Sequence, residues 1–115
     1  MNNSLLLVYK NLYGEITDES LFKAVLYDHE LLLKILEIPL VESYTKISIL
    51  EILSTIVFNE KKDLFEHYAK DSNIKIRKLC FITLLDIKSS RKFLEEIVRT
   101  EKNIALKSYM NERLY

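Results

Sequence analysis

One short segment of the sequence occurs twice, with its two copies about thirty residues apart. The better copy spans residues 71–85, and the second spans residues 101–110. In each copy a polar turn precedes an apolar residue, a basic residue and a second apolar residue four positions after the first. A turn signal that recurs at this interval is typical of helical hairpins, each of which buries its apolar face against a neighbouring copy. The pattern favours a scaffold for binding over a catalytic domain.

The composition also favours helices. The 115 residues include one glycine, Gly14, and one proline, Pro39, although sheets and irregular loops normally need both as turn residues. Hydrophobic residues make up 49% and charged residues 30% of the chain, which is the balance of a globular protein. We therefore predict one all-α domain over residues 1–115, built as a short right-handed stack of antiparallel helical hairpins.

Apolar periodicity and capping residues predict seven or eight helices. Gly14 ends the first helix, Pro39 ends the third and Asn59 caps the fifth. A break at Asp28 separates the second and third helices, although residues 18–38 could also form one helix. The predicted helices span residues 3–13, 18–27, 29–37, 43–58, 60–70, 73–87, 90–100 and 103–114. The predicted inward residues of the sixth helix are Ile76, Leu79, Cys80, Thr83 and Leu84.

The better copy resembles the HEAT repeat. The residues that carry the resemblance are Asp71, Ile76, Arg77, Cys80 and Leu84. The resemblance implies a HEAT-like α-solenoid. It also implies that Arg77 and Asp71 tie adjacent repeats together, which is an architectural role.

The other copies of this unit depart from the HEAT pattern. Lys107 replaces the arginine and Met110 replaces the small residue in the copy at 101–110. In the copy expected near 43–53, Ser48 stands at the basic position. The resemblance covers residues 43–114.

Motifs for catalysis or cofactor binding are absent from the sequence. A single glycine excludes a phosphate-binding loop and a dinucleotide-binding fingerprint, and no HExxH, CxxC or GxSxG occurs. Cys80 is the only cysteine and stands at a small core position, so neither a disulfide framework nor a nucleophile is expected. Asp63, His67 and Asp71 are spaced to share one helical face, but such residues are more often solvated than metal-binding. We predict no enzyme activity, no cofactor and no metal.

Charge is distributed unevenly along the chain, although the net charge is zero. Residues 1–58 hold four lysines and eight acids, whereas residues 59–115 hold thirteen basic residues and nine acids. Opposite charge on the two ends of a stack predicts that one end binds a partner of opposite sign.

These features predict a protein that blocks or sequesters one protein partner. A bias towards Lys, Ile, Asn and Tyr, typical of horizontally acquired bacterial genes, favours an immunity or antitoxin-type inhibitor of a basic, nuclease-like toxin. Tyrosines and acids would form its interface, because tyrosine supplies contact area with few rotatable bonds. The predicted partner-binding residues are Tyr9, Tyr13, Glu15, Asp18, Glu19, Asp28, Glu30, Glu37 and Tyr44.

Two alternatives remain open. An adaptor or regulatory subunit would use the same surface. A nucleic-acid binder would instead use a basic surface made of Lys88, Arg91, Lys92 and Arg99, although acids interrupt this surface and the pI near 6.7 is ordinary. The sequence shows no convincing signal peptide and no apolar run of membrane-spanning length, so we expect a cytoplasmic protein.

Overall fold

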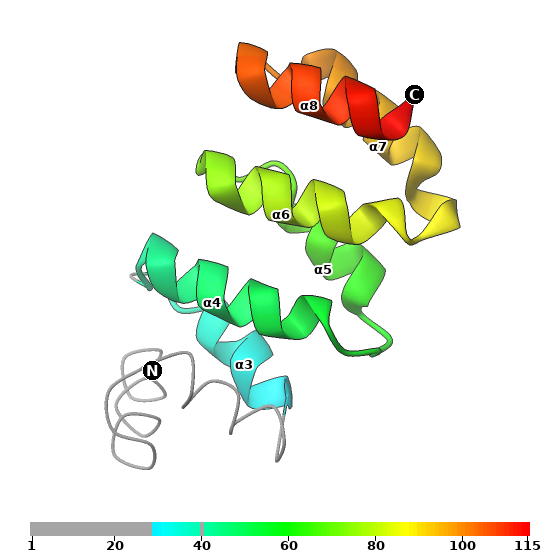
Figure 1. Cartoon of the computed structure of the whole chain (residues 1–115). Coiled ribbons are helices and arrows are strands. Elements are labelled where there is room, and N and C mark those ends of the chain that lie inside the picture. Colours follow the sequence, from blue (N-terminus) through cyan, green and yellow to red (C-terminus); the bar gives the residue numbers. More distant parts are fainter. Residues whose placement is uncertain (1–28, 40) are drawn as a thin grey trace. The chain divides into compact units, whose positions relative to one another are not determined.

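The computed structural model describes residues 29–39 and 41–115, and these residues form helices and loops without strands (Figure 1). The all-α prediction is therefore confirmed for the described residues. The chain divides into two compact units, Met1–Ile56 and Val57–Tyr115, and each is described by itself. The predicted helices at 3–13 and 18–27 and the predicted break at Asp28 lie outside the described residues. The prediction of a single domain stays a prediction.

In the first unit, α3 (His29–Leu36) packs against α4 (Ser43–Ser54). The prediction that this second helix reaches residue 58 was wrong. The hydroxyl of Ser54 donates to the carbonyl of Glu51 (2.6 Å) and that of Thr55 donates to the carbonyl of Ile52 (2.7 Å). Three β-branched residues follow Ser54, and such residues lose side-chain freedom in a helix, so the helix ends early.

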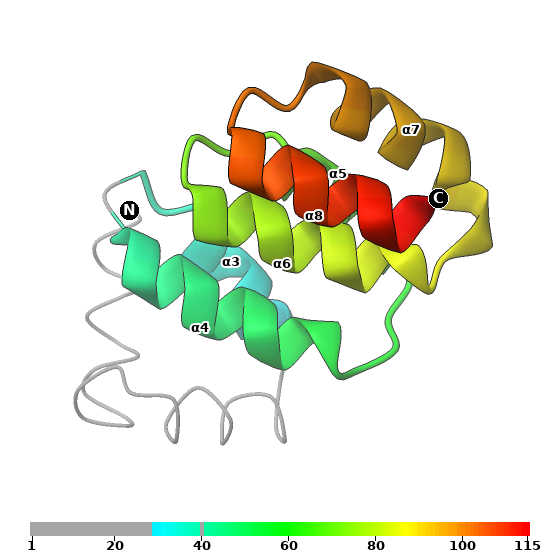
Figure 2. The same ribbon diagram turned by 45° about the horizontal axis from the view of Figure 1, so that its top comes forward.

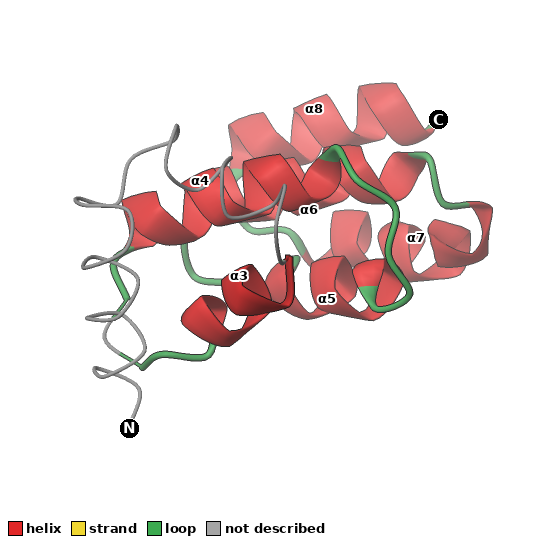
Figure 3. Ribbon diagram, turned by 90° about the horizontal axis from the view of Figure 1, so that it is seen from below, coloured by secondary structure: helices red, strands yellow, loops and turns green. Residues whose placement is uncertain are grey.

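The second unit contains two helical hairpins. The first hairpin is α5 (Lys61–Tyr68) with α6 (Ile74–Leu85), and the second is α7 (Arg91–Thr100) with α8 (Ile104–Leu114). The short 3₁₀ helix η1 (Lys88–Ser90) joins them. Figure 2 shows α6 and α8 side by side, and Figure 3 shows α5 and α7 in a second layer beneath them.

The core of the second unit surrounds α6, which contacts α5, η1, α7 and α8. Ile76, Cys80, Thr83 and Leu84 are buried as predicted, whereas Leu79 is half-buried. Phe81 is also fully buried, although it was not among the predicted inward residues. A helix that packs against several neighbours buries more than one stripe, which explains why a single-stripe prediction missed this residue.

The repeated sequence segment forms the same turn twice. The side chain of Asn73 caps α6 by accepting from the N–H groups of Lys75 (2.9 Å) and Ile76 (3.3 Å). Asn103 caps α8 in the same way by accepting from the N–H of Leu106 (3.0 Å). The predicted cap at Asn59 was wrong, since α5 begins after Glu60 and has no side-chain cap.

We expect the cap variants Asn73→Ala and Asn103→Ala each to lower the free energy of unfolding by about 1 kcal/mol, because each leaves helix N–H groups without an acceptor. Urea denaturation followed by circular dichroism measures both losses. Asn59→Ala is the matched control and should change stability by less than about 0.5 kcal/mol, since its side chain caps no helix. An equal loss in all three variants would contradict the assigned caps.

Over the residues that the structure describes, no helix combines the length and the apolar character that crossing a membrane requires.

Candidate functional site

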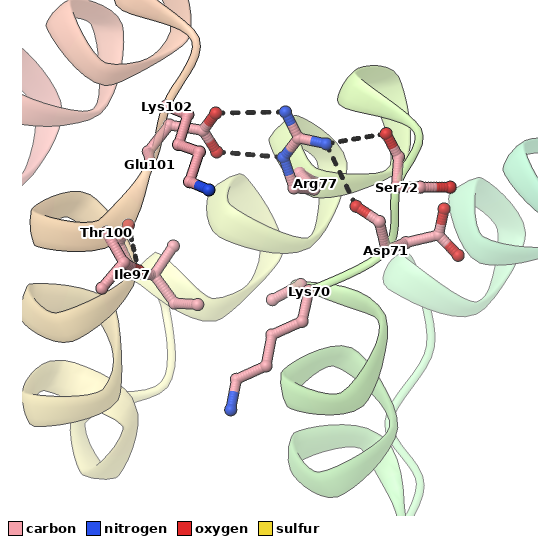
Figure 4. Close-up of a pocket in the computed structure, with 9 residues that line it drawn as sticks. Lys70, Asp71, Ser72, Arg77, Ile97, Thr100, Glu101 and Lys102 are labelled. Atoms are coloured by element: carbon pink, nitrogen blue, oxygen red, sulfur yellow. Dashed lines mark hydrogen bonds and ion pairs between the residues drawn. The ribbon is translucent and has the colours of Figure 1, made fainter.

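Arg77 joins the two turns of the second unit (Figure 4). Its Nε and Nη2 donate to the two carboxylate oxygens of Glu101 at 3.0 and 3.1 Å. Its Nη1 donates to the main-chain carbonyls of Asp71 (3.1 Å) and Ser72 (2.8 Å). We call this set of contacts the Arg77 bridge. It connects the turn before α6 with the turn before α8, so it holds the two hairpins in one register.

The acid that pairs with Arg77 is Glu101. Figure 4 shows the carboxylate of Asp71 directed away from the guanidinium, and its Oδ1 accepts from the N–H of Asn73 (2.8 Å). The Oε2 of Glu101 likewise accepts from the N–H of Asn103 (2.9 Å). Both acids therefore order their own turns, and Glu101 also forms the salt bridge to Arg77.

Burial by itself would raise the pKa of Glu101, because its side chain is only 4% exposed. The hydrogen bonds from Arg77 and Asn103 and the charge of Arg77 outweigh this effect and hold the pKa below its ordinary value. The carboxylate therefore stays ionised in the folded protein at neutral pH.

This shift predicts a pH dependence of stability. A carboxyl whose pKa is lower in the folded state contributes stability that is complete above its unfolded pKa, about 4.3 for glutamate, and is lost as the pH falls through the lower folded value. We expect Glu101→Gln to remove part of the acid sensitivity in thermal melts between about pH 5 and pH 2. An unchanged pH dependence of the melting temperature in this variant would contradict the role of Glu101.

A pocket of about 470 Å³ lies beside the Arg77 bridge, between the ends of α5 and α7. Its lining includes Lys70, Lys102 and the two members of the salt bridge. Arg77 already donates to four oxygens within the protein, and Lys70 lies 5.5 Å from the ring centroid of Phe93. The charged groups at the centre of this pocket serve the packing of the hairpins, so we assign it a structural role.

A second hollow lies between α6 and α8 and has a volume of about 240 Å³. We call it the α6–α8 groove. It is lined by Ile74, Lys75, Lys78, Asn103, Ala105, Leu106 and Tyr109. Ile74, Ala105, Leu106 and the ring of Tyr109 give its walls an apolar character. Ile74 is 40% exposed, so apolar surface in this groove is available to a partner, and the groove is a better candidate for binding than the pocket beside the bridge.

Basic side chains surround the α6–α8 groove. The ammonium of Lys78 lies 4.5 Å from the ring centroid of Tyr109, and the guanidinium of Arg113 lies 4.9 Å from it. Lys75 is exposed on the first turn of α6. Helix α6 contains three basic residues and no acid. The groove therefore combines an apolar floor with a positive rim.

Exposed apolar residues recur at the same place in successive hairpins. Tyr44 in the first turn of α4, Ile74 in α6 and Ile104 in α8 stand thirty residues apart and are 62%, 40% and 87% exposed. Ile74 and Ile104 are the first residues of α6 and α8, and Tyr44 is the second residue of α4. Single exposed apolar residues are common on protein surfaces, but their recurrence at the repeat interval is not explained by packing.

The predicted partner-binding residues fall into two groups. Glu30 and Glu37 are exposed around α3, and Tyr44 is exposed on α4. The remaining predicted residues, Tyr9, Tyr13, Glu15, Asp18, Glu19 and Asp28, lie outside the described residues. The acidic and tyrosine-rich interface therefore stays a prediction, and Tyr44 alone among these residues joins the recurring set.

The alternative basic surface lies on η1 and α7, where Lys88, Arg91, Lys92 and Arg99 are all exposed. Arg91 pairs with Glu95 (3.5 Å), and Arg99 pairs with Glu96 through its Nε (3.0 Å) and Nη2. The hydrogen bond from Arg99 also holds the pKa of Glu96 below its ordinary value. Carboxylates on the same helix thus compete with any phosphate for both arginines.

The remaining candidates for chemistry do not form a site in the described part of the chain. Asp63 and His67 are exposed on α5, but α5 ends at Tyr68, so Asp71 lies in the turn and not on the same helical face. No group of three metal-ligating side chains gathers among the described residues. Burial, together with the nearby charge of Asp71, raises the pKa of the Cys80 thiol to about 12, so the thiol is not ionised at neutral pH.

Comparison of the chain with models of protein families, with curated proteins and with solved structures found no match. The candidate site therefore rests on the geometry of the chain itself. The sequence pattern did not single out Ile74, Tyr109 or Glu101 as functional residues. A signal for Ile74 was present, because the apolar residue after each asparagine cap recurs at the repeat interval.

Proposed function

We propose that this chain is a non-catalytic, HEAT-like helical-repeat module that binds one protein partner through the first turns of the second helices of its hairpins. The observation that carries the proposal is the recurrence of exposed apolar side chains at Tyr44, Ile74 and Ile104. Apolar and aromatic residues on an otherwise polar surface are enriched at the centres of protein interfaces. A repeat scaffold presents such residues at regular intervals of the sequence, at the same position in each hairpin.

The contacts in the second unit support the HEAT-like assignment. The same acid-and-asparagine turn precedes α6 and α8, and Arg77 links the two turns. In the last hairpin Lys107 replaces the arginine, and its ammonium donates to the carbonyl of Arg99 at 3.3 Å. A basic residue on both α6 and α8 therefore contacts the preceding turn or helix end, which supports the interpretation that these two hairpins are similar units.

The more specific prediction of an immunity-type inhibitor of a basic toxin depends on acids that lie mainly before His29, outside the described residues. It stays a prediction, as does the alternative of an adaptor subunit. The nucleic-acid alternative is less well supported, because acids already pair with Arg91 and Arg99.

The test is capture of a partner by the full chain from a lysate of the cells that produce it. We expect one protein to bind at a fixed stoichiometry to the unmodified chain. The triple variant Tyr44→Ser/Ile74→Ser/Ile104→Ser should bind it at least about thirtyfold more weakly, because central interface residues each contribute about 2 kcal/mol or more. All three side chains are exposed, so the substitutions should leave the fold intact.

The matched control is Val57→Ser/Tyr115→Ser, which removes two other exposed apolar side chains (98% and 72% exposed). We expect this control to bind the partner as well as the unmodified chain does. Equal binding by the triple variant, or recovery of nucleic acid without any protein, would overturn the proposal.

A further inference from the structure

We propose that the α6–α8 groove binds an acidic segment of the partner protein, which inserts one apolar side chain between Ile74 and Tyr109. The proposal rests on the proposed function and adds the binding site in the second unit and the chemistry of its ligand. The size, walls and charge of the groove and the position of the Tyr109 ring support this assignment.

The size and walls of the groove suit a side chain of a protein. Its volume of about 240 Å³ lies below the roughly 300–1,000 Å³ that is usual for pockets that enclose a whole drug-sized molecule. Leu106 forms a buried floor, while Ile74 and Ala105 remain exposed at the edges. An apolar side chain placed here would remove the exposed surface of Ile74 from water, at about 25 cal/mol for each Å² buried.

The charge of the rim selects the flanking residues of the ligand. Lys75, Lys78 and Arg113 are exposed around the groove, and Glu112 is the one acid of α8. The rim therefore has an excess of positive charge, and α6 itself contributes no carboxylate. A segment with acids on either side of its apolar residue would be steered to the groove and held in register.

The position of Tyr109 favours a protein segment over a nucleic acid. Proteins that bind single-stranded nucleic acids stack bases on open aromatic rings. The charged groups of Lys78 and Arg113 both lie within 5 Å of the Tyr109 ring centroid, so these cations already pack against the ring on which a base would have to stack. The aliphatic side chains of Ile74 and Ala105 in the groove offer no stacking surface, but they suit contact with an apolar side chain.

The experiment is selection of peptides from a phage-displayed library of random dodecapeptides against the full chain. We expect the selected peptides to be enriched in Asp and Glu around one Leu, Ile or Phe. Fluorescence anisotropy of labelled selected peptides should show at least tenfold weaker binding to Lys75→Glu/Lys78→Glu. Binding to the unmodified chain should also weaken as salt is raised.

The matched control is Lys88→Glu/Lys92→Glu, which reverses two exposed lysines on η1 and α7, away from the groove. We expect it to change the affinity less than threefold. Circular dichroism should show that both double variants keep the helical fold. The Lys75→Gln/Lys78→Gln variant removes the two positive charges without adding negative ones. It tests the role of the rim lysines even if Lys75→Glu/Lys78→Glu fails to fold.

Three outcomes would overturn the inference. The selected peptides could lack acidic residues, they could bind the Lys75→Glu/Lys78→Glu variant as tightly as the unmodified chain, or no peptide could be selected while a labelled single-stranded oligonucleotide binds. The first two outcomes do not contradict the proposed function if the unmodified chain captures a partner protein and the Tyr44→Ser/Ile74→Ser/Ile104→Ser variant does not. Loss of the inference and loss of the proposed function are therefore separate results.

Discussion

Arg77→Met should lower the free energy of unfolding by about 3 kcal/mol, because it leaves the carboxylate of Glu101 buried without its cation. The side chain of Glu101 is 4% exposed and that of Arg77 is 20% exposed, so water can replace the lost contacts only in part. The variant also removes the donor to the carbonyls of Asp71 and Ser72. Urea denaturation of the full chain measures the loss.

Two further variants test whether the loss of stability in Arg77→Met comes from the Arg77 bridge or from the removal of any arginine. Arg99→Met removes an exposed partner of Glu96 and should lower the free energy of unfolding much less than Arg77→Met does, because water screens exposed ion pairs. The double variant Arg77→Met/Glu101→Leu should recover part of the loss, because removing both charges leaves no unpaired buried ion. If Arg77→Met costs no more than Arg99→Met, the Arg77 bridge does not hold the hairpins together.

Phe81→Ala should lower the free energy of unfolding by about 3–5 kcal/mol, since it removes a large, fully buried ring and leaves a cavity. Phe81 lies on α6, the helix that contacts every other helix of the second unit. A loss of this size is a large part of the total stability of a small domain. We therefore expect the variant to melt at a much lower temperature, as measured by circular dichroism.

The adjacent residue provides the control for the core. Ile82→Ala changes a side chain that is 40% exposed and should cost less than about 1.5 kcal/mol. Similar losses in the two variants would show that Phe81 does not fill the centre of the core.

The sequence predicted the second unit well because its signals are local. Asn73 and Asn103 directly determine where α6 and α8 begin, and the predicted helix starts differ from the observed ones by one residue. The early end of α4 was missed because the hydroxyls of Ser54 and Thr55 donate hydrogen bonds to main-chain carbonyls of the last turn. Apolar periodicity gives no indication of such hydrogen bonds.

Contacts between hairpins were harder to predict than the hairpins. The resemblance implied that Arg77 and Asp71 tie adjacent repeats together, but it did not name Glu101, twenty-four residues from Arg77, as the acid of the salt bridge. This pairing depends on the register between two packed hairpins, which no single helix pattern contains. The α6–α8 groove was missed for the same reason, since Ile74 and Tyr109 come from different helices.

The most direct test of the account is an NMR titration of the ¹⁵N-labelled chain with its captured partner, or with a selected acidic peptide. If the partner binds at the α6–α8 groove, the largest amide shift changes should occur in the first turns of α6 and α8, around Ile74 and Ile104, and near Tyr109. Shift changes confined to η1 and the exposed side of α7, around Lys88 and Lys92, would contradict it.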